Sequence, residues 1–154
     1  MISDEQITQA VGQYGDMLYR LAVITLKNTA DAEDAVSDTF LAYMTKAPDF
    51  ADKSHEKAWL ITVVLNRCRD ILRKRKRIIP DSGELLLTLP QPPEENSVLE
   101  ALMTLPEKQR TAMTLHYVNG CRIAEISHIL GISTSAVKMR LHKGRQLLEK
   151  ALDN

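Results

Sequence analysis

The strongest concentration of reactive charge in the sequence is a basic run, residues 67–77, which holds seven Lys or Arg and the single acid Asp70. Guanidinium and ammonium groups at this density bind phosphates and gain affinity by releasing the counterions of a nucleic acid. A solvated helix end has the same composition when its charge complements the negative pole of the helix dipole. Residues 67–77 alone leave both interpretations open.

Charge is segregated along the chain, although the formal net charge is zero. Residues 31–38 hold four acids and no base, and residues 78–107 hold six acids and no base. Residues 67–77 and 138–150 contain most of the positive charge. Cationic segments favour phosphates, whereas acidic segments need a basic protein surface or open water. The alternation indicates more than one partner.

Side chains that serve catalysis or metal binding are not arranged for either purpose. The sequence has no Gly-rich phosphate loop and no nucleophile motif, and its histidines show no metal-ligand spacing with its cysteines. These residues are His55, His116, His128, His142, Cys68 and Cys121. An enzyme is therefore a poor interpretation, and we expect no cofactor and no metal. The distance between the two cysteines in the sequence predicts buried reduced thiols rather than a disulfide.

The composition predicts a soluble protein with a core. Of the 154 residues, 44% are hydrophobic and 26% are charged. No apolar run approaches the roughly 18 residues needed to span a bilayer, and residues 1–10 lack the basic start and apolar stretch of a signal peptide. We expect a cytoplasmic location without membrane insertion.

Apolar periodicity in the first half predicts three helices, at residues 4–28, 31–46 and 58–77, with Asp31 as the cap of the second and a loop at residues 47–55. Their short connections favour one compact helical domain. The expected inward residues are Ile7, Val11, Met17, Leu18, Leu21, Ala22 and Leu26 in the first helix, Ala35, Val36, Thr39, Phe40, Tyr43 and Met44 in the second, and Leu60, Ile61, Val64, Leu65, Cys68, Ile71 and Leu72 in the third.

Two outward helix faces in this half remain for partners. Asp31, Asp34 and Asp38 are expected to share the outer face of the second helix. Acids near a helix start are favoured by the dipole alone, but Asp38 lies too far into the helix for that explanation. The third helix has a second face, separate from its apolar one, that is formed by Trp59, Thr62, Asn66, Arg69 and Arg73.

The second half is set apart by residues 78–97, where Pro and Gly interrupt every pattern and predict a linker. Its acids keep it solvated or have a specific role, and the composition does not separate the two. Helices are expected near residues 98–103 and from Pro106 to Gly120 as C-cap.

A helix-turn-helix is predicted next, from a helix at residues 122–130, a tight turn at Gly131 and a longer helix capped by Ser133 that ends near Leu152. Such a second helix lies in the major groove of DNA, whereas the alternative is a plain helical hairpin. Ile123, Ile126, Ile129, Leu130, Val137, Leu141 and Leu148 are expected to pack the pair. Thr134, Ser135, Lys138, Met139, His142 and Lys143 are left on its outer side.

In this order the two halves resemble the RNA polymerase sigma factors of the sigma-70 family, in particular the extracytoplasmic-function (ECF) group, which keeps only regions 2 and 4. DAEDAVSDTFL, residues 31–41, resembles the polymerase-binding helix of region 2. AWLITVVLNRCRDILRKRKR, residues 58–77, resembles its promoter-melting and minus-10 helix. ALMTLPEKQRTAMTLHYVNG and EISHILGISTSAVKMRLHKGRQLL, within residues 101–148, resemble the minus-35 recognition segment of region 4.

The resemblance implies an all-α chain of two small helical domains: a region 2-like domain of three or four helices at residues 1–77, an acidic Pro-containing linker at residues 78–97, and a region 4-like helix-turn-helix domain at residues 98–154. Such a chain binds core RNA polymerase, recognises the minus-35 and minus-10 promoter elements and helps to open the DNA. The implied partners are the beta-prime clamp helices and beta flap of core polymerase, promoter DNA and an anti-sigma factor.

The resemblance also assigns roles to individual residues. Polymerase contacts fall on Asp34, Ser37, Asp38 and Leu41. Minus-10 contacts, including a pocket for a flipped base, fall on Phe50, Asp52, Lys53, Asn66, Arg69, Arg73 and Lys74. Minus-35 contacts fall on His116, Thr134, Ser135, Lys138, Met139, His142 and Lys143. Packing, ion pairs or phosphate contacts are assigned to Arg140 and Arg145.

Departures from the family pattern limit what can be carried over. Ser37 stands where Gln is frequent, a departure that concerns the detail of the polymerase contact. Ser127 stands where Ala is frequent, Arg122 and Ile123 where Ser-Tyr is usual, and Met139 where Ser is common, so the promoter sequence is not transferable. The alternative interpretation is a helix-turn-helix regulator with an N-terminal sensor or dimerisation domain. The acidic second helix and the basic third helix argue against it, because a sensor needs neither.

Overall fold

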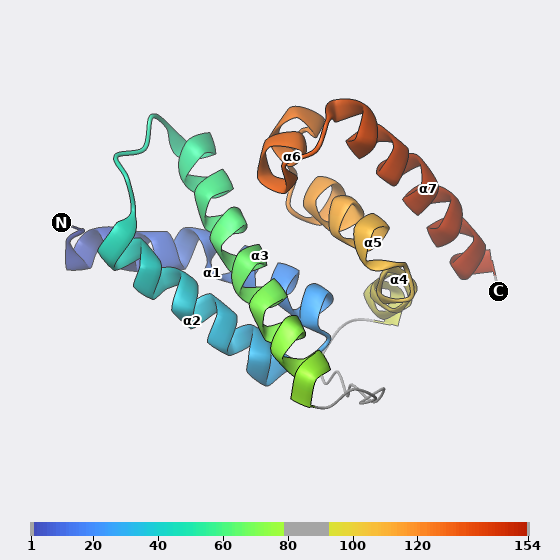
Figure 1. The fold of residues 1–154 in the computed structure, drawn as a ribbon, viewed down its shortest axis with the longest axis horizontal. Coiled ribbons are helices and arrows are strands. Elements are labelled where there is room, and N and C mark those ends of the chain that lie inside the picture. The colour runs from blue at the N-terminus through green and yellow to red at the C-terminus, as the bar shows by residue number, and fades with distance from the viewer. Residues whose placement is uncertain (1, 79–92, 154) are drawn as a thin grey trace. The chain divides into compact units, whose positions relative to one another are not determined.

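The computed structural model describes residues 2–78 and 93–153, and within these ranges every regular element is a helix (Figure 1). The chain divides into two compact units, with the boundary between Leu87 and Thr88. The expected all-α class with two helical domains is confirmed. Most of the expected linker, residues 78–97, lies outside the described residues.

The N-terminal unit consists of α1 (Asp4–Leu26), α2 (Thr29–Lys46) and α3 (Lys53–Ile78), and each of the three helices packs against the other two. α1 begins with a capping box. The Ser3 hydroxyl accepts a hydrogen bond from the Gln6 N–H at 3.1 Å, and the Gln6 side-chain oxygen accepts one from the Ser3 N–H at 2.9 Å. Two otherwise unpaired donors at the helix start are thereby satisfied.

The junction between α1 and α2 differs from the prediction at its cap. Lys27 takes the left-handed backbone conformation with φ of 55°, and Asn28 then caps α2 by accepting a hydrogen bond from the Asp31 N–H at 2.8 Å. The prediction that Asp31 caps this helix is wrong. Asn serves as an N-cap as well as Asp does, so the helix starts earlier and the Asp31 carboxylate is left for another contact.

The apolar side of α3 forms the centre of this unit, as predicted. Its Cys68 is a buried thiol whose pKa is raised to about 12 by burial, and Cys121 in the other unit is also buried and outside any disulfide. The prediction of buried reduced thiols is therefore confirmed. The buried residues of α3 are Leu60, Ile61, Val64, Leu65 and Cys68, whereas Ile71 and Leu72 are half-buried.

Two residues predicted to point inward lie at the surface instead. Val11 is 46% exposed, because it lies in the early part of α1, before Tyr14, where most side chains have no cover. Met44 is 45% exposed. It follows the buried Thr39 by five residues, which turns it about 140° away around α2. Both were predicted to point inward because they are apolar, and that prediction is wrong.

One carboxylate ties the three helices together. Glu56, in the first turn of α3, accepts a hydrogen bond from the Tyr14 hydroxyl of α1 at 3.0 Å and one from the Tyr43 hydroxyl of α2 at 2.7 Å. Burial, and then the hydrogen bond to Glu56, raise the pKa of each tyrosine to about 12. The contact fixes the start of α3, where the loop from α2 arrives.

The C-terminal unit begins with α4 (Pro93–Met103) and α5 (Glu107–Met113), so α4 starts five residues before its predicted position. A buried arginine holds the turn between the two helices. Arg110 donates from Nη1 to the carbonyl oxygens of Leu105 at 3.1 Å and Met103 at 3.4 Å. Carbonyls at a helix end that would otherwise lack a partner are satisfied in this way.

The predicted single helix from Pro106 to Gly120 ends in a wider turn. Its last part is the π-helix η1 (Thr114–Val118), in which the Asn119 N–H donates to the Thr114 carbonyl at 3.0 Å. Gly120 then takes φ of 68°, the left-handed region expected of a helix-ending glycine. Single π turns are often found at functional positions.

The helix-turn-helix is confirmed as α6 (Ile123–Leu130) and α7 (Thr134–Asp153). Gly131 ends α6 with φ of 67°, and the Ser133 hydroxyl caps α7 by accepting from the Ala136 N–H at 3.0 Å. Ser127, which replaces a frequent Ala, donates its hydroxyl across the turn to the Ile132 carbonyl at 2.5 Å. The buried residues that pack the pair include Ile126, Ile129, Val137 and Leu141.

Candidate nucleic-acid and partner interfaces

The outer side of α3 presents a row of exposed polar and basic residues. Asn66, Arg69, Arg73 and Lys74 are all exposed, as the sequence predicts. Asn66 and Arg73 lie seven residues apart on one face, a rise of about 10.5 Å. Arg73 forms an ion pair with the neighbouring Asp70, but both side chains are largely exposed and such a pair contributes little. Its guanidinium therefore remains available to a phosphate.

Two other basic residues of α3 are engaged with the preceding helices. Arg75, only 18% exposed, pairs with Asp31 and donates from Nη1 to the Leu26 carbonyl at 3.1 Å. The Arg67 Nε lies 3.9 Å from an Asp38 carboxylate oxygen. The expected shared outer face of the three aspartates is thus divided, because two of them turn toward α3.

The loop before α3 folds into an aromatic cluster. The Phe50 ring stacks on Tyr43 with centroids 6.1 Å apart and meets Trp59 edge-on at 5.8 Å and His55 at 5.2 Å. Trp59 lies seven residues before Asn66 on the same face, so the cluster stands about 10.5 Å from that amide along α3. The structure therefore brings Phe50 and Asn66 to one side of the helix.

Trp59 lies on this side of α3 but is not among the minus-10 contacts that the sequence analysis assigns. The signal was present in the sequence, because Trp59 shares the spacing of Asn66 and Arg69. Aromatic faces stack on unpaired bases without regard to sequence, so the half-buried Trp59 beside the basic residues of α3 is a candidate contact for an unpaired strand.

Asp52 and Lys53 do not lie beside Asn66 on the outer side of α3. The Asp52 carboxylate caps α3 by accepting from the His55 N–H at 2.8 Å. The Lys53 ammonium donates to the Gln13 side-chain oxygen of α1 at 3.2 Å and lies 3.9 Å from the Glu56 carboxylate. Lys53 precedes Asn66 by 13 residues, about 20 Å along the helix axis. The structure thus places these two residues at the start of α3, away from Asn66.

The remaining exposed face of α2 combines acid with apolar surface. Asp34, Ser37 and Leu41 are exposed, with Leu41 at 59%, and Asp38 borders them. Met44 continues the row one turn later, which the sequence assignment missed by placing it in the core. The spacing of three, four and seven residues makes this a single docking face.

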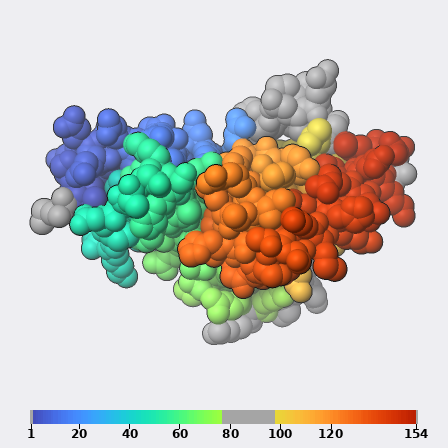
Figure 2. Space-filling model, turned by 90° about the horizontal axis from the view of Figure 1, so that it is seen from above, coloured from blue at the N-terminus to red at the C-terminus, as the bar shows by residue number. Residues whose placement is uncertain are grey.

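The outer face of α7 is open along the predicted residues, while Val137, Leu141 and Gly144 are buried on the opposite face. α7, dark orange to red, contributes a broad area to the surface of its unit (Figure 2). Met139 is 72% exposed, the highest value among the exposed large hydrophobic residues of the described chain. The exposed residues of this face are Thr134, Ser135, Lys138, Met139, His142 and Lys143.

His116 is held by the π turn rather than extended from a regular helix. Its Nδ1 lies 2.9 Å from the Cys121 carbonyl oxygen, and its ring meets Tyr117 edge-on at 4.7 Å. A carbonyl only accepts, so Nδ1 carries the proton in this contact and Nε2 is left for a further partner.

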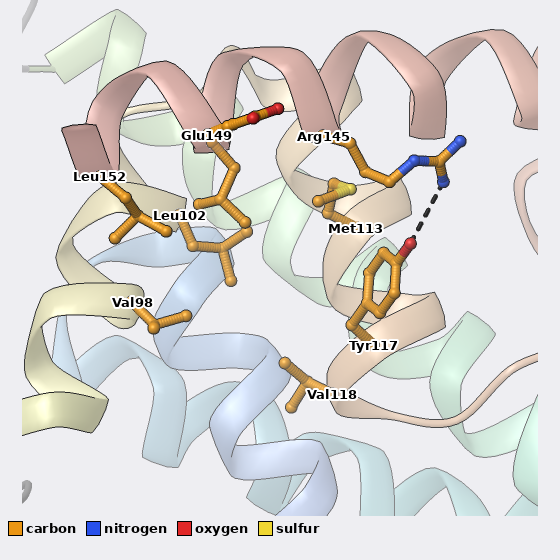
Figure 3. A pocket seen from close by; sticks show the side chains of 9 residues that line it. Val98, Leu102, Met113, Tyr117, Val118, Arg145, Glu149 and Leu152 are labelled. Atoms are coloured by element: carbon orange, nitrogen blue, oxygen red, sulfur yellow. Dashed lines mark hydrogen bonds between the residues drawn. The ribbon is translucent and has the colours of Figure 1, made fainter.

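An apolar groove of about 390 Å³ lies within the C-terminal unit, between α4, η1 and α7 (Figure 3). At one rim the Arg145 guanidinium donates to the Tyr117 hydroxyl at 3.2 Å. Several lining residues are exposed and apolar, an arrangement that marks a protein-docking surface. The lining residues are Val98, Leu102, Met113, Tyr117, Val118, Arg145, Leu148, Glu149 and Leu152.

Within residues 2–78 and 93–153, no three His, Cys, Asp or Glu side chains gather where they could hold a metal ion. In the same ranges no helix is both long and apolar enough to cross a bilayer.

Two family models match the chain. The model described as "Sigma-70 region 2" matches residues 10–78, and the model described as "Sigma-70, region 4" matches residues 95–148. Each model therefore covers one of the two units described above.

Curated relatives match along most of their length. The ECF RNA polymerase sigma factor SigM of Bacillus subtilis is 31% identical over 157 residues, which cover 96% of this chain and 95% of SigM. SigM of Mycobacterium tuberculosis is 32% identical over 139 residues, which cover 88% of this chain and 71% of that protein.

Solved structures agree with these matches. The sigma factor RpoE of Bartonella quintana, in complex with the anti-sigma factor NepR, superposes with a TM-score of 0.82 at 27% identity, covering 95% of this chain and 96% of RpoE. CnrH, in complex with the cytosolic domain of CnrY, gives a TM-score of 0.75 at 27% identity and covers 98% of this chain and 90% of CnrH.

Proposed function

The chain belongs to the ECF group of sigma-70 family RNA polymerase sigma factors, and from this membership we propose how its two units divide the work. It is a transcription initiation factor that acts with core polymerase at promoters. The regulator with a sensor domain is not favoured, because the N-terminal half matches region 2. The proposed division keeps a region 2-like domain at residues 1–77, a linker at 78–97 and a region 4-like domain at 98–154.

The α2 face docks on core polymerase. Its acids Asp34 and Asp38 attract a basic surface, and the exposed Leu41 supplies apolar area that is favourable to bury. The beta-prime clamp helices are the polymerase element that the family resemblance assigns to this face. Ser37 lies in the middle of the row and is small enough to let a partner helix approach.

The outer side of α3 holds the opened minus-10 strand. Arg69, Arg73 and Lys74 offer charge to successive phosphates, and the Asn66 amide offers hydrogen bonds to a base edge. Phe50 and its aromatic cluster provide an apolar surface on the same side of α3, about 10.5 Å along the helix from that amide. Asp52 contributes by capping α3, and Lys53 lies at the same end of the helix, where it contacts Gln13 and Glu56.

The C-terminal unit binds the minus-35 duplex and the polymerase flap. The outer face of α7 enters the major groove, with Lys138 and Lys143 at phosphates and the early residues Thr134 and Ser135 at base edges. His116, through Nε2, adds a contact from the preceding helix. The apolar groove is on a different part of the unit and takes an apolar segment of the beta flap.

The same surfaces are those an anti-sigma factor would mask. RpoE and CnrH were each solved with an anti-sigma partner or a cytosolic partner domain, and this chain resembles both along nearly its whole length. We assign an anti-sigma factor as a partner and the cytoplasm as the site of action on this basis.

The observation that supports the proposal best is that one small unit carries two exposed surfaces of opposite charge. One is the acidic and apolar face of α2, and the other is the basic face of α3 with its aromatic cluster. The test is in vitro transcription with core polymerase and a promoter library, with permanganate footprinting of unpaired thymines. The expected result is an open complex on a subset of promoters. Core polymerase binding without an open complex on any promoter would refute the proposed strand-holding role.

A further inference from the structure

The recognition face of α7 contains one apolar side chain in an otherwise polar surface. Met139 is 72% exposed, and its neighbours on that face, Ser135 one turn before and His142 and Lys143 one turn after, are exposed and polar. An exposed methionine side chain keeps its rotamer freedom, but its apolar surface contributes nothing to stability until a partner covers it.

The packing of the C-terminal unit does not use this side chain. The opposite side of α7 is closed by Val137, Leu141 and Gly144, and an added Cβ on Gly144 would stand 2.5 Å from the Met113 Cγ. The apolar groove is lined by other residues and does not include Met139. Met139 therefore belongs to the DNA-facing surface alone.

The major groove of DNA exposes one methyl group, the C5-methyl of thymine, beside base-edge groups that donate or accept hydrogen bonds. A thioether neither donates nor accepts strongly, and its unbranched chain adapts to a surface of irregular shape. We propose that Met139 contacts a thymine methyl in the minus-35 element and makes the promoter preference of this chain depend on that methyl group. This inference rests on the proposed function of α7.

The arrangement of charge around Met139 supports a fixed register. Lys138 and Lys143 flank it in sequence, so phosphate contacts on either side would hold the thioether over the floor of the groove. Ser135 lies four residues earlier on the same face and would contact the adjacent base pair. Only Met139 among these residues distinguishes a methyl group from a hydrogen.

The test uses the protein bound to core polymerase and the minus-35 duplex that this complex selects from a random pool. Each thymine of the duplex is replaced in turn by deoxyuridine, which removes the methyl and nothing else. Burying one methyl-sized group is worth about 0.8 kcal/mol, so one replacement should weaken binding about fourfold. With Met139→Ser the same replacement should have no effect.

Lys138→Gln is the matched control. It should weaken binding to thymine and deoxyuridine duplexes equally and leave the fourfold ratio intact, because it removes a phosphate contact. Met139 is exposed, so its substitution should not unfold the unit. An equal methyl effect in the wild-type and Met139→Ser proteins, or no effect at any thymine, would overturn the inference while leaving duplex binding by α7 standing. Selection of no duplex at all would overturn both.

Discussion

Removal of the Glu56 carboxylate should destabilise the N-terminal unit selectively. Glu56 accepts two tyrosine hydrogen bonds, at 3.0 and 2.7 Å, and its side chain is only 14% exposed. A hydrogen bond to a charged group contributes about 1.5 kcal/mol at the lower end of its range. Glu56→Ala loses both and should cost about 3 kcal/mol, whereas Glu56→Gln keeps one carbonyl acceptor and should cost about half as much.

Hydrogen exchange on the full chain, followed by mass spectrometry, measures this cost unit by unit. A loss of about 3 kcal/mol should speed exchange of the most protected α1–α3 amides by roughly a hundredfold and leave the α5–α7 amides unchanged. Glu5→Gln, an exposed acid in the first turn of α1, is the matched control and should change exchange less than about threefold. Equal changes in exchange rate for Glu56→Ala and Glu5→Gln would refute the role of Glu56 in holding the three helices together.

The hydrogen bonds from Tyr14 and Tyr43 to Glu56 also predict a loss of stability at high pH. The folded-state pKa values of Tyr14 and Tyr43 are raised to about 12, above the ordinary value of 10.0. A raised pKa means that the unfolded chain loses these protons first, so the contribution is fully present below pH 10 and is lost between about pH 10 and 12. Urea unfolding across this range, compared with Tyr14→Phe, checks the sign. If the stability of Tyr14→Phe fell with rising pH as steeply as that of the parent protein, the prediction would be contradicted.

The remaining predictions concern the surfaces and the packing of α7. Asn66→Ala combined with Arg69→Ala should spare core polymerase binding but abolish permanganate reactivity in the minus-10 region, because the lost groups face the opened strand; promoter melting by the double variant would disprove this role for α3. Leu41→Asp should weaken assembly with core polymerase at least about tenfold without changing the circular dichroism spectrum, since a 59% exposed side chain is not part of the core; unchanged affinity would remove Leu41 from the docking face. Gly144→Ala should destabilise the C-terminal unit by about 1–3 kcal/mol in thermal unfolding, because its Cβ would stand 2.5 Å from the Met113 Cγ. Met113→Ala in the same chain should recover part of that loss. Stabilisation by Gly144→Ala alone would show that the Met113 side chain moves aside freely.

Local patterns predicted most of the helical framework because they depend on neighbours in the sequence. The 3, 4, 7 spacing from Leu60 to Cys68 predicted the buried side of α3, and the turn and cap residues Gly131 and Ser133 predicted the helix-turn-helix. Errors arose where two residues of similar type competed. Asn28 caps α2 in place of Asp31, and the choice between them depends on where the preceding helix ends.

The exposure of the candidate site residues was predicted well where it follows from helix periodicity. The contacts of long side chains were predicted less well. Asn66 and Arg69 are exposed on the predicted face, as are the recognition residues of α7. Lys53 turns to Gln13, which lies 40 residues earlier, and no local pattern contains that contact. Trp59 has the same spacing as Asn66 in the sequence, and its edge-on contact with Phe50 makes it part of the candidate site.

The sequence by itself determined the helices, the helix-turn-helix, the segregation of charge and the family, since each is encoded in residue type and short-range spacing. The tertiary structure decided which basic groups are available: Arg75 is taken by Asp31, 44 residues away, whereas Arg69 remains at the surface. It also decided the Glu56 tie and the apolar groove of the C-terminal unit. The physical reason is that burial and pairing between distant segments depend on how helices pack, and a linear pattern does not specify which long-range partner a charged or apolar side chain will meet.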